Sequence, residues 1–196
     1  MSDINGYLIV AACAAIVTFA VTPFVMSLAR LKNWMAQPDP RKVHTTPTPD
    51  IGGVALLVGI ITALLLAWQM DRFGPIFDGS SEMLGVAIAA IAICAIGFID
   101  DIREISAPAK VAGTAGVGMV LVWAGVTMFY FRVPFLGVIQ LGNDWIPIVT
   151  VVWLLGMVQA INLIDGLDGL AAGIVAIGST AFFIYSRHLS GLGLLS

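Results

Sequence analysis

Long apolar runs decide the fold, and residues 83–101 show the pattern: they read MLGVAIAAIAICAIGFIDD, an uncharged run that ends at two aspartates. An α-helix rises about 1.5 Å per residue, so roughly 20 apolar residues cross the hydrocarbon of a bilayer. The other runs cover residues 7–29, 51–70, 111–131, 145–161 and 169–186. They are apolar on every face, which excludes a β-barrel. The sequence therefore predicts an all-α, polytopic membrane helix bundle, with six transmembrane helices in one domain over residues 1–196.

The composition of the whole chain is typical of a membrane protein. Of its 196 residues, 59% are hydrophobic and 11% are charged, and the mean hydropathy is +1.00. A water-soluble domain cannot bury that much apolar surface. The net charge of −3 and the absence of a basic patch exclude a nucleic-acid binder. Cys13 and Cys94 lie inside apolar runs, so we expect neither a disulfide nor a zinc site.

Positive charges predict the orientation of the helices, because cytoplasmic loops are enriched in Lys and Arg. Six of the nine basic residues lie on one side, within residues 30–50 and 103–110. Arg72, Arg132 and Arg187 fall on the other side. We therefore expect both termini outside. The inner face would carry three loops, at residues 41–53, 100–110 and 162–168.

Proline and glycine predict where helices begin and end. The prolines between residues 36 and 50 disfavour a helix, so this segment should be an extended loop. Ser106-Ala107-Pro108 is typical of a helix start, with a capping hydroxyl and a proline in the first turn. Gly169 and Gly173 are spaced for close contact with another helix. Residues 131–143 are expected to form a small hairpin.

Acidic residues gather at the predicted inner face. Two aspartates, Asp100 and Asp101, follow the third apolar run, and Asn162, Asp165 and Asp168 lie between the last two runs. On a continuous helix the last three would share one face. Carboxylates at a membrane edge repel each other unless cations gather them, and Mg²⁺ prefers oxygen ligands. The pattern predicts a magnesium site. Each acidic pair taken alone has a simpler explanation, because carboxylates often mark a membrane boundary and Asp-Gly pairs often form turns.

Three motifs resemble one enzyme family. Residues 41–53, RKVHTTPTPDIGG, resemble the RKxHxxPTPxxGG signature of polyprenyl-phosphate N-acetylhexosamine-1-phosphate transferases, of the glycosyl transferase family 4 type. Residues 97–101, GFIDD, followed by Ser106 and Lys110, resemble the family's aspartate-pair loop. Residues 162–171, NLIDGLDGLA, match its NxxDGLDGLA segment. The first motif is closer to the undecaprenyl-phosphate GlcNAc-1-phosphate transferase branch than to the phospho-MurNAc-pentapeptide translocase branch.

The resemblance implies a multi-pass enzyme of the bacterial inner membrane with its active site on the cytoplasmic face. Such an enzyme moves a sugar 1-phosphate, here GlcNAc-1-phosphate, from a UDP-sugar to undecaprenyl phosphate and releases UMP. This step starts the synthesis of a cell-envelope polysaccharide such as lipopolysaccharide or teichoic acid. The resemblance also implies Mg²⁺ as cofactor, with Mn²⁺ as the alternative. The oligomeric state stays open, with a homodimer as one alternative.

Roles for individual residues follow from the same resemblance. Asp100 and Asp101 would be catalytic, Asp100 by positioning or deprotonating the lipid phosphate. The metal ligands would be Asp101, Asp165 and Asp168. The substrate-binding residues would be Arg41, His44, Thr48, Lys110, Asn162 and Asp165. Direct attack by the lipid phosphate and attack through a covalent aspartyl intermediate both stay open.

The chain departs from the family's pattern at two points. Thr114 stands where many relatives carry glutamine. The resemblance implies a bundle of ten or eleven helices with a further aspartate-bearing loop and a histidine-rich loop. We therefore expect residues 1–196 to be the N-terminal part of such an enzyme and to be inactive alone. Two other classes stay open: a cation-transport protein, which would carry its carboxylates deep within helices, and a non-catalytic membrane fragment.

Overall fold

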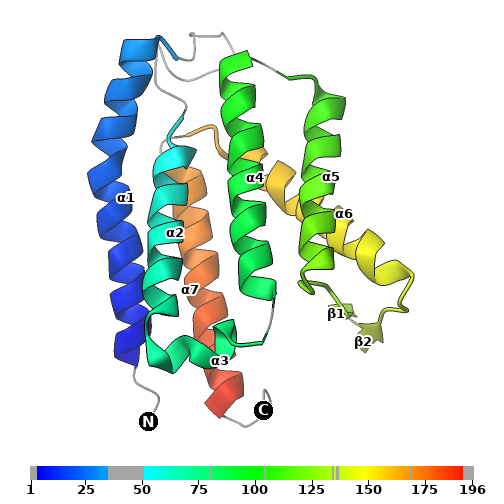
Figure 1. Ribbon diagram of the computed structural model, residues 1–196. Coiled ribbons are helices and arrows are strands. Elements are labelled where there is room, and N and C mark those ends of the chain that lie inside the picture. The colour runs from blue at the N-terminus through cyan, green and yellow to red at the C-terminus, as the bar shows by residue number, and fades with distance from the viewer. Residues whose placement is uncertain are drawn as a thin grey trace.

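The computed structural model describes residues 4–34, 51–79, 81–103, 105–133, 135, 137–167 and 169–191. These residues form a bundle of helices with one β-hairpin at its side (Figure 1). The helices are α1 (Ile4–Lys32), α2 (Gly53–Trp68), the short 3₁₀ turn η1 (Asp71–Phe73), α3 (Gly74–Phe77), α4 (Glu82–Arg103), α5 (Ala107–Trp123), α6 (Trp145–Ile164) and α7 (Leu170–Gly191). The strands are β1 (Tyr130–Val133) and β2 (Gly137–Gln140).

Each of the six predicted apolar runs forms a helix, which confirms an α-helical membrane protein. Among the described residues, four helices, α1, α4, α6 and α7, are long and apolar enough to cross a membrane. Helix α2 adds a fifth crossing only if it is joined to residues 71–77, from which it is bent by 94°. The sixth predicted crossing is not shown, because α5 is a shorter apolar helix of 17 residues. It stops at Trp123 because the chain turns at Gly125, whose φ is +94°.

Small residues hold α1 and α2 together. Every fourth residue of α2 is small and buried: Ala55, Gly59, Ala63 and Ala67. A Cβ added to Gly59 would lie 2.8 Å from the backbone oxygen of Ala14 and would also collide with the Thr18 side chain. Small side chains allow such close approach between membrane helices, where packing replaces the hydrophobic effect. The α1–α2 pair is therefore a rigid support for the rest of the bundle.

A compact core lies at one end of the bundle. It is formed by buried Val25, Ala29, Ile51 and Ala55, from α1 and the start of α2. Trp34 and Phe98 pack against this cluster. Their rings meet edge to face, with centroids 5.4 Å apart. This contact ties α4 to the α1–α2 pair two residues before Asp100.

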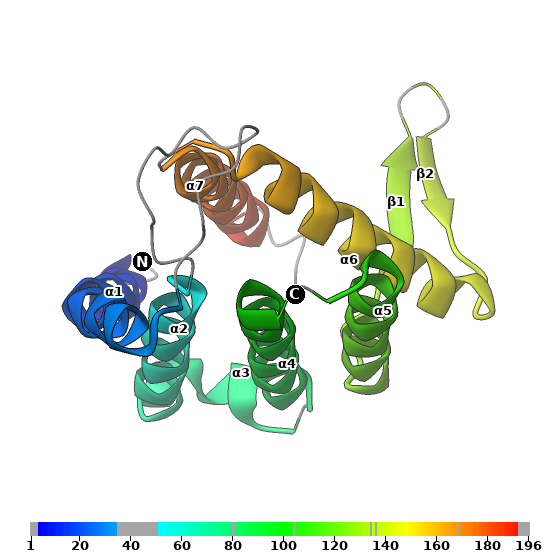
Figure 2. The same ribbon diagram turned by 90° about the horizontal axis from the view of Figure 1, so that it is seen from above.

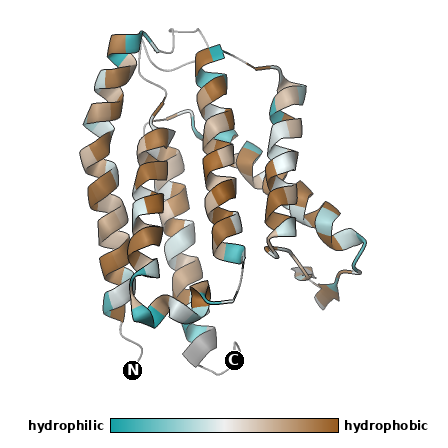
Figure 3. Cartoon of the chain, viewed as in Figure 1, coloured by the Kyte–Doolittle hydropathy of each residue, from teal (hydrophilic) through white to brown (hydrophobic). Residues whose placement is uncertain are grey.

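The three connections predicted for the inner face share one end of the bundle. The end of α1, the start of α2, the end of α4, the start of α5, the end of α6 and the start of α7 lie toward the top of Figure 1, and α1 begins and α7 ends at the opposite end. Hydrophilic residues gather at the helix ends, and the middles of the helices are hydrophobic (Figure 3). Arg30, Lys32 and Arg103 belong to the last turns of α1 and α4, at the shared end. The convergence expected from charge is therefore confirmed.

The helices stand in two groups. Seen from above, α1, α2, α4 and α5 form a curved row, and α6 and α7 lie to one side of it (Figure 2). Helix α6 crosses the bundle at a slant (Figures 1 and 2). A Cβ added to Gly118 of α5 would lie 3.0 Å from the Val151 side chain, so α5 and α6 approach closely near their middles.

The local predictions have mixed outcomes. The hairpin is confirmed, with Tyr130 opposite Gln140 and Val133 opposite Gly137. Helix α5 begins at Ala107 with a proline in its first turn, as predicted, but the hydroxyl of Ser106 makes no cap hydrogen bond. A Cβ added to Gly169 or Gly173 would meet nothing within 4 Å, so no described element packs on that strip. The predicted extended loop at residues 36–50 lies outside the described residues, and the homodimer stays a prediction.

Candidate active site

The predicted site residues that the structure describes lie at the end of the bundle where α4 and α6 end and α5 begins (Figure 1). Asp100 and Asp101 belong to the last turn of α4, and Lys110 belongs to the first turn of α5. Asn162 belongs to the last turn of α6, and Asp165 follows that helix directly. The other predicted site residues lie outside the described residues: Arg41, His44, Thr48 and Asp168.

Asp100 is held by two partners from the α4–α5 connection. The Lys110 ammonium Nζ lies 2.7 Å from Asp100 Oδ2. The backbone N–H of Ile105 donates a hydrogen bond of 3.2 Å to Asp100 Oδ1. Both side chains are partly buried, at 27% exposure for Asp100 and 36% for Lys110. Both carboxylate oxygens of Asp100 are therefore engaged within the chain.

The helix ends make this ion pair more favourable. An anion in the last turn of α4 faces the negative end of that helix's dipole, and a cation in the first turn of α5 faces a positive end. Each charge alone would be unfavourable where it stands. Pairing Asp100 with Lys110 neutralises both charges. The packing of α4 against α5 therefore offsets the unfavourable interaction of each charge with its own helix dipole.

Asp101 lies at a groove that sequence reasoning did not find. The Asp101 side chain is exposed, and the residue lines a cavity of about 280 Å³ between α2 and α4. The rest of the lining is mostly apolar and includes Val54, Leu57, Ile93 and Phe98. No sequence signal could have located this groove, because it depends on which helices are neighbours.

The last motif forms a turn and not a continuous helix. Helix α6 ends at Ile164, and the Asp165 N–H donates to the Ile161 oxygen at 3.0 Å. The Gly166 N–H then donates to the Ile164 oxygen at 2.8 Å, and Gly169 has a φ of +76°. Asp165 therefore lies outside the helix, in the connection predicted between the last two apolar runs, and the Asp165-Gly166 turn interrupts the helix, so Asn162 and Asp165 do not share a helical face. Asn162 and Asp165 are both exposed.

The described side chains offer the kind of oxygen ligand that Mg²⁺ binds, but they do not form a complete metal site. Asp101, Asp165 and Asn162 offer only carboxylate and amide oxygens, the ligands that Mg²⁺ prefers. Within the described ranges, no group of three or more His, Cys, Asp and Glu residues is placed to hold a metal ion. Asp101 and Asp165, both exposed, are therefore the described candidate ligands.

Thr114, the departure from the family's glutamine, lies one turn beyond Lys110 on α5. Its side chain is buried. The position therefore belongs to the packed interior of the bundle, next to the candidate site but not on its exposed surface.

Comparison with known proteins shows which family the chain resembles. Glycosyl transferase family 4 matches residues 83–195. The decaprenyl-phosphate N-acetylglucosaminephosphotransferase of Mycobacterium leprae is 39% identical over 178 residues, which are 90% of this chain and 45% of that protein. The probable undecaprenyl-phosphate N-acetylglucosaminyl 1-phosphate transferase of Bacillus subtilis is 36% identical over 172 residues, 87% of this chain and 45% of that protein.

A phospho-N-acetylmuramoyl-pentapeptide-transferase of Desulfitobacterium hafniense is 29% identical, over 83% of this chain and 51% of that protein. The higher identity to the two N-acetylglucosamine relatives agrees with the branch that the first motif indicates. No solved structure matches the chain. The chain spans about half the length of these curated relatives. Because the family match covers more than half of its residues, this chain belongs to glycosyl transferase family 4.

Proposed function

We propose that this chain carries part of the active site of a polyprenyl-phosphate sugar-1-phosphate transferase. The donor would be UDP-GlcNAc, and the acceptor would be undecaprenyl phosphate. An oxygen of the lipid phosphate would form a bond to the sugar-bearing phosphorus, the bond from that phosphorus to UMP would break, and UMP would leave. The observation that carries the proposal is the Asp100–Lys110 ion pair, at the end of the bundle where α4 ends and α5 begins. The names of the relatives support these substrates.

Both substrates are anionic where they react, so the site must supply positive charge. The Lys110 ammonium has three N–H donors, and its pair with Asp100 uses one of them. The remaining donors can reach phosphate oxygens. Bound Mg²⁺ would neutralise the pyrophosphate and stabilise UMP as it leaves. Asp101, Asp165 and Asp168 are the residues that we propose hold it.

The ion pair also separates the roles of the two adjacent aspartates. Asp100 would act as a positioning residue, because its carboxylate orients Lys110 and accepts from the Ile105 N–H. Asp101 is exposed and borders the groove, so it is the better placed of the two to meet a substrate or a metal. This division favours Asp101 as the catalytic carboxylate of the pair.

The membrane arrangement belongs to the same proposal. The shared end of the bundle carries Arg30, Lys32, Arg103 and Lys110, so we propose that it faces the cytoplasm of a bacterial cell. Helix α5 runs beside α4 between the two ends of the bundle (Figure 1). Its 17 residues span about 25 Å at 1.5 Å per residue, near the lower limit for a crossing. Six crossings are therefore proposed, with α2 and residues 71–77 forming one of them.

A cation-transport function fits the structure less well. An ion path through the bilayer would need carboxylates in the middle of helices. Asp100 and Asp101 lie in the last turn of α4, and Asp165 lies beyond the end of α6. The placement of these carboxylates at helix ends favours an interfacial reaction.

A transfer assay tests the proposal. The chain alone, and the chain fused to the C-terminal remainder of the Bacillus subtilis relative, would be reconstituted with undecaprenyl phosphate, Mg²⁺ and radiolabelled UDP-GlcNAc. We expect label in the lipid fraction from the fusion and none from the chain alone, because an open half-site lacks the preorganisation that electrostatic catalysis needs. A fusion that is folded, binds UDP-GlcNAc and still transfers nothing would contradict the proposal.

A further inference from the structure

The β-hairpin presents an apolar surface that no described element covers. The exposed apolar residues Phe129, Tyr130, Phe135, Val138 and Ile139, which lie on both faces of the hairpin and at its tip, are together called the hairpin surface. Phe135 is the extreme case, at 108% exposure with a φ of +71°. Apolar side chains in water carry a free-energy cost that scales with their exposed area. A hairpin with this surface therefore needs an apolar partner.

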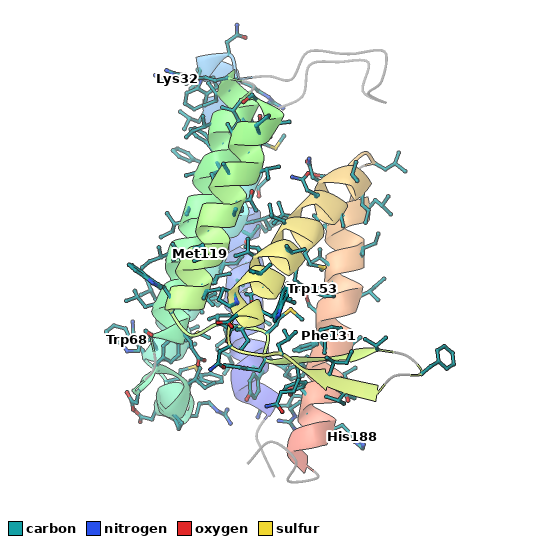
Figure 4. All side chains as sticks on the ribbon, turned by 90° about the vertical axis from the view of Figure 1, so that its right-hand side faces the viewer. Lys32, Trp68, Met119, Phe131, Trp153 and His188 are labelled. Carbon is teal, nitrogen blue, oxygen red and sulfur yellow. The ribbon has the colours of Figure 1, made fainter. Side chains whose placement is uncertain are left out.

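The flanking helices place the hairpin at the level of a membrane boundary. Helix α5 ends at Trp123, which is 92% exposed, and α6 begins at the exposed Trp145. Tryptophans at the ends of membrane helices lie preferentially at the membrane–water interface. The hairpin projects from this level, at the end of the bundle opposite the candidate active site (Figures 1 and 4).

Hydrogen bonds fix the base of the hairpin to α6. The Met128 N–H donates to Thr150 Oγ1 at 3.0 Å, and this hydroxyl donates to the Ile146 oxygen at 2.7 Å. Thr150 is 7% exposed, so these bonds are shielded from water. The Leu141 N–H donates to the Phe129 oxygen at 2.8 Å and closes the base of the hairpin. These bonds therefore set the position of the strands, and the strands carry Phe135 in the turn that joins them.

The unpaired backbone groups and the charge of the hairpin exclude it from the hydrocarbon core of the bilayer and favour a position in the membrane–water interface. A two-stranded hairpin leaves the outer edges of both strands without a strand partner, and such edges are not tolerated in hydrocarbon. In the interface these edges can bond to water and headgroups. Between residues 124 and 143 the sequence has one charged residue, Arg132, and no acidic residue that would repel lipid phosphates.

We propose that the hairpin surface docks onto the lipid bilayer, in the interface at the end opposite the active site. In this position Phe135 and its apolar neighbours lie at the boundary between the lipid headgroups and the acyl chains. This docking anchors the outer end of the slanted helix α6, whose other end carries Asn162 and leads into Asp165. The proposal rests on the hairpin's own geometry and does not depend on the transferase activity.

Spin labels in the full chain test the docking. Single cysteines at Phe135 and Val138, and at the exposed Asp144 as a polar control at the same end, would be introduced in a background lacking Cys13 and Cys94. The chains would be reconstituted in phosphatidylcholine–phosphatidylglycerol vesicles and labelled. Power saturation would then compare access of apolar oxygen with access of a polar nickel chelate, which stays in water.

We expect the ratio of oxygen access to nickel access to be several-fold higher at Phe135 and Val138 than at Asp144. Ratios at Phe135 and Val138 as low as that of the label free in water would show a hairpin standing in water and would overturn the proposal. Immobilised labels with little access to either reagent would also overturn it, because protein would then cover the surface. If dilution with unlabelled lipid released such labels, the covering protein would be a second copy of the chain.

Discussion

Lys110 Nζ lies 2.7 Å from Asp100 Oδ2, and this pair joins the last turn of α4 to the first turn of α5. The connection between these helices is short, and Asp100 also accepts from the Ile105 N–H within it. The pair therefore sets how α4 and α5 meet at the candidate active site. It also supplies the clearest tests of the roles proposed for the two aspartates.

Replacing Lys110 should weaken the α4–α5 junction. Lys110→Met leaves a partly buried Asp100 without its cation, and we expect the free energy of unfolding to fall by about 1 kcal/mol, the upper range for a partly exposed pair. Thermal unfolding in detergent, followed by circular dichroism, would measure it. Arg103→Met, an exposed residue of the same turn of α4, is the matched control and should change little.

Exchanging the two charges separates stability from activity. The double variant Asp100→Lys with Lys110→Asp restores the pair and places each charge at the helix end whose dipole favours it. We expect stability to return to that of the unsubstituted chain or above it. In the active fusion, transfer should nevertheless stay lost, because the cation no longer stands where phosphate binds. A double variant as unstable as Lys110→Met would argue against the ion pair.

Asp101→Asn should remove activity without unfolding the chain. The substitution keeps the size of an exposed side chain and deletes one charge beside the groove. Loss of a few kcal/mol of transition-state stabilisation would lower transfer by the fusion about 10²-fold or more. Asp144→Asn, at the opposite end of the bundle, is the control. If Asp101→Asn transferred sugar phosphate at the control's rate, Asp101 would have no catalytic role and would only mark the membrane boundary.

Gly59 should tolerate no side chain. The Cβ of Gly59→Ala would lie 2.8 Å from the Ala14 oxygen, so α1 and α2 must separate, at a cost of about 1–3 kcal/mol. Gly116→Ala is the matched control, because a Cβ at this α5 position meets nothing within 4 Å. Unfolding midpoints of the two variants would be compared in the same detergent. Equal midpoints would mean that the α1–α2 contact is looser than described.

Cysteine labelling in intact cells tests the proposed orientation. In a background lacking Cys13 and Cys94, cysteines at Arg103 and Gly166 should resist an impermeant thiol reagent, because they lie at the end proposed to face the cytoplasm. A cysteine at Asn143, at the opposite end, should react. Permeabilised cells provide the control for reactivity. Labelling of the Arg103 site from outside would reverse the topology.

Much of the fold was predictable because it depends on local composition. The apolar runs lie where the long helices form, since each helix in a membrane satisfies its own backbone hydrogen bonds. Basic residues predicted that three connections share one end, and a small hairpin was expected at residues 131–143. The candidate residues Asp100 and Asp101 were found because carboxylates at the ends of apolar helices are costly and therefore conspicuous, and Lys110 was found through the family resemblance.

Other features depended on neighbours that are distant in the sequence, and only the tertiary structure decided them. The groove at Asp101 exists because α2 and α4 are neighbours. Asp100 could have been a free base by sequence, but the packing of α5 against α4 commits it to Lys110. The sequence by itself determined which segments are helices and which ends carry charge, and helix packing determined which of those charges neutralise each other.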